Sequence, residues 1–118
     1  MRSNIEIGAG GETLAVQWLS SQGFTILKRN FRNGRYEIDI VAGHNNILHF
    51  IEVKCRRTKT YGHPEESVSR KKLEHILEGG AGWLLRWPGY RRVQYDVLAV
   101  TLQHPKPPEY LLFEDVYL

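Results

Sequence analysis

The chain has 118 residues, of which 42% are hydrophobic, and its 16 Lys and Arg against 13 Asp and Glu give a net charge of +3. This length suits one hydrophobic core and is too short for two, so we expect a single domain over residues 1–118. Because no apolar run reaches the roughly 18 residues of a membrane span and the start lacks the apolar centre of a signal peptide, we expect a soluble, cytoplasmic protein without a membrane partner.

The first half of the sequence predicts one helix and three strands. Apolar residues recur at helical spacing over residues 11–22, and Gly23 is a typical C-terminal cap. Asn33-Gly34 and Asn45-Asn46 are turn sequences that separate β-rich runs. The predicted strands are residues 24–31, 37–42 and 47–56.

The second half predicts a helix and two further strands. Apolar spacing indicates a helix over residues 67–86, although Gly79, Gly80 and Gly82 weaken its middle. Strands are predicted over residues 93–102 and 110–116. The order α-β-β-β-α-β-β indicates an α/β fold, with a mixed central sheet flanked by helices.

Two acidic residues are predicted to converge in the hairpin formed by the second and third strands. If Asn45-Asn46 forms a two-residue turn, the register places Asp39 opposite Glu52. Directly opposed carboxylates repel each other unless a cation compensates them, and hard ions such as Mg²⁺ take oxygen ligands. Lys54 shares the strand face of Glu52, where an ammonium group can position an attacking water and stabilise charge on a phosphate.

A simpler interpretation of the same residues is a solvent-facing amphipathic hairpin. In the predicted register Glu37 lies opposite Lys54, and the two side chains would form an ordinary cross-strand ion pair. The apolar residues that surround the charges in 50–54 argue instead for the interior of a sheet. Spacing alone leaves both interpretations open.

Several short motifs occur together in a fixed order: Gly11-Glu12, Glu37-Ile38-Asp39, Glu52-Val53-Lys54, Tyr61-Gly62 and Tyr95-Asp96-Val97. Together they resemble the YraN family of small bacterial proteins, which is related to archaeal Holliday-junction resolvases and to the PD-(D/E)XK nuclease superfamily. The resemblance implies a restriction-endonuclease-like αβββαβ core and, by analogy with the resolvases, a homodimer. Tyr36 departs from the family, which usually has glycine before the residue that matches Glu37.

The resemblance also implies roles for individual residues. Glu12, Asp39 and Glu52 match metal-binding carboxylates, and Lys54 matches the catalytic lysine. The expected cofactor is Mg²⁺ or Mn²⁺. The expected function is a metal-dependent endonuclease that hydrolyses DNA phosphodiester bonds, with branched or junction structures as candidate substrates.

Two other functions remain open at this point. The chain could be a nucleic-acid-binding module that keeps the nuclease fold with little or no activity, or a protein-interaction domain. Basic groups favour a nucleic-acid partner, although for any single group a solvated surface is the commoner explanation. The basic residues selected as nucleic-acid contacts are Arg56, Arg57, Lys71 and Lys72.

A few remaining residues are expected to have structural roles. Asp96, on an apolar strand, is expected to be partly buried and paired with a basic residue. The five histidines lack metal-ligand spacing and are expected at the surface or in packing. Cys55 is expected to be a small core residue. Trp83 and Trp87 could stack on unpaired bases, but covering a core is the more common role.

Overall fold

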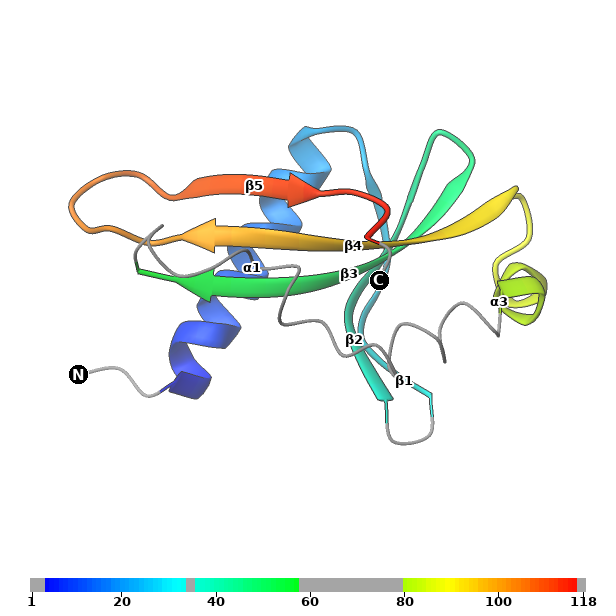
Figure 1. Cartoon of the computed structure of the whole chain (residues 1–118), viewed down its shortest axis with the longest axis horizontal. Coiled ribbons are helices and arrows are strands. Elements are labelled where there is room, and N and C mark those ends of the chain that lie inside the picture. Colours follow the sequence, from blue (N-terminus) through cyan, green and yellow to red (C-terminus); the bar gives the residue numbers. More distant parts are fainter. Residues whose placement is uncertain (1–3, 34–35, 58–79, 117–118) are drawn as a thin grey trace.

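The structure is a computed structural model that describes residues 4–33, 36–57 and 80–116. These residues form a five-stranded mixed sheet in the order β1-β2-β3-β4-β5, in which β3 and β4 are parallel and the other neighbours antiparallel. The expected α/β fold is confirmed (Figure 1). The elements are α1 (Asn4–Ser21), β1 (Thr25–Asn33), β2 (Tyr36–His44), β3 (Ile47–Arg56), α3 (Gly80–Arg86), β4 (Arg92–Thr101) and β5 (Glu109–Phe113).

Strand β3 has the predicted bounds, and the other strands differ from the prediction by one to three residues at their ends. Helix α1 begins at Asn4, earlier than the predicted residue 11, because the apolar repeat that signals it starts only at Leu14. Of the predicted helix 67–86, residues 67–79 lie outside the described part of the chain. Neither described helix is long and apolar enough to cross a membrane.

The end of α1 shows why the cap was predictable. Gly23 has a φ of 93°, a left-handed conformation that glycine adopts without steric cost. The N–H of Phe24 donates to the carbonyl of Leu19, and that of Gly23 donates to Ser20, at 3.0 and 3.2 Å. This pattern is a Schellman motif, which ends the helix and turns the chain into β1.

The two faces of the sheet bury separate apolar clusters. One face packs under α1, where Ala15 and Leu19 contact strand residues that include Ile51 and Leu98. The other face packs against α3, whose Trp83 ring lies 5.5 Å from those of Phe31 and Phe50, centroid to centroid. Figure 1 shows α1 crossing the sheet and α3 beside the start of β4. The expected packing role of Trp83 is confirmed.

Helix α1 approaches β3 closely at Gly11. A methyl group at this position would overlap Sγ of Cys55, so Gly11→Ala should destabilise the fold by about 1–3 kcal/mol through overpacking. The double variant Gly11→Ala/Cys55→Ala should recover most of this loss in urea unfolding. Gly10→Ala is the control, because its methyl group meets no atom within 4 Å and should change stability by no more than about 1 kcal/mol. Equal effects of the two glycine variants would contradict this close approach.

Candidate metal centre

The hairpin between β2 and β3 has the predicted register. Asn45 and Asn46 both have positive φ, 51° and 65°, as a two-residue type I′ turn requires. The pairing begins with His44 opposite Ile47. It ends with Ile40 opposite Ile51, one pair before Asp39 and Glu52 would meet.

Beyond that last pair, the sheet forks between β2 and β3. Strand β2 continues along β1, with Ile38 opposite Phe31, while β3 continues along β4, with Glu52 opposite Val97. Figure 1 shows the β1–β2 hairpin diverging from the ends of β3 and β4. The predicted pairing of Glu37 with Lys54 is therefore wrong. The carboxylate of Glu37 instead lies 3.6 Å from Arg32 of β1, in a surface ion pair.

Asp39 lies at the base of the fork. Its Oδ2 accepts a hydrogen bond of 2.7 Å from the backbone N–H of Val53. This contact takes the place of a backbone ladder bond and orients the Asp39 carboxylate toward the segment that carries Glu52 and Lys54, on either side of Val53. The predicted proximity of Asp39 to this segment is thus achieved by a side-chain contact rather than by strand pairing.

Glu52 is half-buried, and its Oε2 accepts a hydrogen bond of 2.9 Å from the hydroxyl of Tyr95. Burial raises the pKa of the Tyr95 phenol, and the negative charges of Glu52 and then Asp39 raise it further. Asp39 and Glu52 thus lie on the two strands that flank the fork. They are not directly opposed in the ladder as predicted, because the β2–β3 pairing ends one pair earlier.

Cys55 connects this region to α1. The thiol is partly buried beside Gly11, and its pKa is raised by burial and by the charge of Asp39. A raised pKa disfavours the thiolate, the nucleophilic form of cysteine. Cys55 also packs against the apolar cluster under α1, so the expected packing role is confirmed.

Glu12 follows Gly11 on the turn of α1 that packs against the forked part of β3. Its side chain is 15% exposed, and its Oε1 lies 3.5 Å from Nε of Arg29 in an ion pair. Among the described residues this buried oxygen has no hydrogen-bond partner. The cation that faces this oxygen is thus the Arg29 guanidinium. Carboxylates such as those of Glu12, Asp39 and Glu52 are the ligand type that a hard ion such as Mg²⁺ or Mn²⁺ prefers.

The predicted basic residues occupy different environments. Lys54 is half-buried on β3 and, through the strand alternation, shares the face of Glu52. Arg56 is partly buried, and its Nε donates to Oγ1 of Thr101 at 3.0 Å, whereas Arg57 is exposed. The remaining predicted contacts, Lys71 and Lys72, and the Tyr61-Gly62 motif lie outside the described residues.

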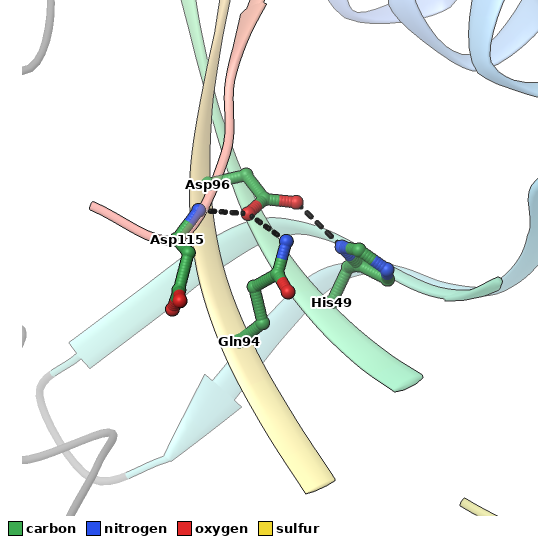
Figure 2. A network of polar contacts seen from close by, with 4 residues as sticks. All are labelled: His49, Gln94, Asp96 and Asp115. Carbon is green, nitrogen blue, oxygen red and sulfur yellow. Dashed lines mark hydrogen bonds and ion pairs between the residues drawn. The ribbon is translucent and has the colours of Figure 1, made fainter. Parts of the chain in front are cut away.

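A second polar cluster lies on the α1 side of β3 and β4 and was only partly anticipated. Asp96 is fully buried, and its partner is the buried His49, whose Nδ1 lies 2.6 Å from Oδ2 of Asp96 (Figure 2). Together with Glu114, these residues place three potential ligand atoms within 4.8 Å of one another. The burial of Asp96 could be predicted because the residue lies on an apolar strand. The pairing of His49 with Asp96 could not, because the two residues are 47 positions apart in the sequence.

The comparisons with known proteins cover this whole region. The model of a family described as "Uncharacterised protein family UPF0102" matches residues 11–100, which include Glu12, Asp39, Glu52 and Lys54. A UPF0102 protein of Cytophaga hutchinsonii is 43% identical over 100 residues, covering 83% of this chain and 87% of its own. A UPF0102 protein of Rhodococcus jostii is 38% identical over 111 residues, which cover 92% of this chain and 93% of the relative. One of Chloroherpeton thalassium is 36% identical over 110 residues, covering 90% and 83%.

Proposed function

This chain belongs to the YraN family, described as uncharacterised protein family UPF0102, and we propose that its sheet fork is the active centre of a divalent-metal-dependent endonuclease acting on DNA. The observation that carries the proposal is the hydrogen bond from the Val53 N–H to Asp39, which holds this carboxylate beside the segment that carries Glu52 and Lys54. Neighbouring carboxylates repel each other, and a divalent ion bound between them would offset this repulsion.

The neighbours of the two carboxylates support this role. One oxygen of Asp39 is oriented by the Val53 N–H, and one oxygen of Glu52 by the Tyr95 hydroxyl. Hydrogen bonds of this kind hold metal ligands in a productive orientation. Glu12 is the third predicted carboxylate and comes from α1, where its Oε1 faces Arg29 in an ion pair that a metal ion would have to replace.

The proposed chemistry is hydrolysis by an in-line attack of water at phosphorus. A bound Mg²⁺ or Mn²⁺ would acidify water and stabilise charge on the phosphate oxygens. Asp39 and Glu52 would hold the ion. Lys54, next along the same strand face as Glu52, would stabilise charge on the phosphate and position the attacking water. A module that only binds DNA would not need converging carboxylates, which repel phosphates.

The test is incubation of the purified protein with linear, single-stranded, flapped and four-way-junction DNA, in Mg²⁺ or Mn²⁺ against a chelator. We expect metal-dependent cleavage by the wild type, with branched substrates as candidates for preference. The control is Glu109→Gln, which removes an exposed carboxylate from β5, a strand separated from β3 by β4, and should cleave like the wild type. Metal-independent binding without cleavage of any substrate would replace this proposal with a binding module.

Arg57 is the side chain best placed to test the DNA contact. It is exposed just beyond β3, whereas Arg56 is engaged with Thr101. We expect Arg57→Ala to weaken DNA binding and to lower the slope of log affinity against log salt by about 1, since one phosphate contact is lost. Metal affinity should not change. An unchanged salt slope in titrations at several salt concentrations would exclude Arg57 as a phosphate contact.

A further inference from the structure

The cluster of His49, Asp96 and Glu114 is separate from the fork. His49 lies opposite Ala42, in the part of β3 that still pairs with β2. Asp96 comes from β4, and Glu114 directly follows β5. Their ligand atoms, one imidazole nitrogen and two carboxylate oxygens, lie within 4.8 Å of one another. Three chain segments therefore bring metal-binding side chains together at a second place.

Asp96 is oriented as a ligand by its neighbours. Its Oδ1 accepts hydrogen bonds of 2.9 Å from Nε2 of Gln94 and from the backbone N–H of Asp115 (Figure 2). Its Oδ2 faces His49 instead. Donors that hold one oxygen of a carboxylate and leave the other directed at a histidine are the usual surroundings of a ligating aspartate.

The histidine has an unusual hydrogen-bonding state. His49 is 2% exposed, and within the described part of the chain its Nε2 is buried without a hydrogen-bond partner. For Nδ1 to bind a metal ion, the ring proton must reside on Nε2. That change leaves a buried N–H at Nε2 without a partner among the described residues, a cost that the bond to the ion must outweigh. It also replaces the contact between Nδ1 and Asp96, and the ion would then join these two groups.

We propose that His49, Asp96 and Glu114 form a second metal site, which binds a zinc-type ion and attaches the segment after β5 to β3 and β4. One imidazole and two carboxylates suit Zn²⁺ better than Mg²⁺, which prefers oxygen ligands alone. Ligands around a tetrahedral zinc ion lie about 3.4 Å apart, given bonds of about 2.1 Å. Binding therefore requires the 2.6 Å contact between His49 and Asp96 to open by several tenths of an ångström. Glu114 is exposed, so its side chain can adjust to the ion and water can complete the coordination.

The experiment measures Zn²⁺ binding by calorimetry and melting curves in the full chain, without an affinity tag. All measurements use a background protein in which Asp39→Asn and Glu52→Gln remove the fork carboxylates, so that zinc cannot bind there. We expect one equivalent of Zn²⁺ to bind and to raise the melting temperature. Because loss of a ligand's supporting contact alone costs 10- to 100-fold in affinity, Glu114→Gln should weaken binding by more than about tenfold.

The matched control is Asp115→Asn, which neutralises the next residue. The contact of Asp115 with Asp96 is made by its backbone N–H, so zinc affinity should be unchanged. Since Glu114 is exposed, its variant tests the site without disturbing the core, and His49→Gln provides a second test. No zinc binding in the background protein, or equal affinity in the Glu114 and Asp115 variants, would overturn the proposal. The outcome is independent of DNA cleavage, which is measured with Mg²⁺ in the wild type.

Discussion

Lys54→Ala should lower the rate of DNA cleavage by about 100- to 1000-fold while leaving metal binding intact, because its charge acts on the phosphate and not on the ion. Asp39→Asn should lose both cleavage and metal binding. In the wild type, Mn²⁺ at about 100 times its dissociation constant should stabilise the fold by about 2.7 kcal/mol, through binding to the folded state. Lys54→Ala should retain this gain, and Asp39→Asn should lose most of it.

The structure makes asparagine the appropriate replacement at position 39. An amide oxygen can still accept the hydrogen bond from the Val53 N–H, so the variant removes the charge without leaving that donor unpaired. In metal-free buffer Asp39→Asn should therefore be as stable as the wild type or slightly more stable, because the repulsion from Glu52 is relieved. Melting curves of the wild type and both variants, with and without Mn²⁺, are read beside a cleavage assay. Identical metal responses of wild type and Asp39→Asn would mean that Asp39 is not a ligand.

Asp96→Ala should destabilise the protein by about 3–5 kcal/mol, the largest stability effect that we expect from a single substitution. The fully buried carboxylate accepts hydrogen bonds from Gln94 and the Asp115 backbone, and contacts the buried His49. Alanine would leave all of these groups buried without their partner, and each unpaired group costs free energy. The measurement is urea unfolding in the presence of a chelator, so that no metal contributes.

The control for Asp96 is again Asp115→Asn, whose side chain is exposed and should change stability by less than about 0.5 kcal/mol. The loss of stability in Asp96→Asn should lie between those of Asp96→Ala and Asp115→Asn. An amide oxygen at position 96 can still accept a hydrogen bond from Gln94 or from the Asp115 backbone. A loss below about 1 kcal/mol for Asp96→Ala would show that the network contributes little to folding.

The two polar clusters differ in how the sheet positions them. At the fork, β2 and β3 separate and their backbones are no longer hydrogen-bonded to each other. The Val53 N–H of β3 donates instead to the side chain of Asp39 on β2. Around Asp96, β3 and β4 stay paired, and Asp96 and His49 are buried beside the intact ladder. The opening at the fork suits an exchangeable ion and a substrate. The buried surroundings of Asp96 suit the attachment of the segment after β5 to β3 and β4.

Local sequence determined the order of the elements and the register of the β2–β3 hairpin. Asn45-Asn46 favours a tight turn, Gly23 favours a helix cap, and strand alternation places Glu52 and Lys54 on one face. These features depend on neighbours within a few residues, which is why they could be predicted. The motifs of the YraN family then supplied the expected roles of Glu12 and Asp39.

Only the tertiary structure decided where the β2–β3 ladder ends and which distant groups meet. The fork depends on competition between strand partners, since β2 follows β1 while β3 follows the parallel β4. The contact of Tyr95 with Glu52 and that of His49 with Asp96 each join residues more than 40 positions apart. No periodicity within either segment encodes such a contact, because it arises when the crossover places β4 beside β3 and burial requires each polar group to find a partner.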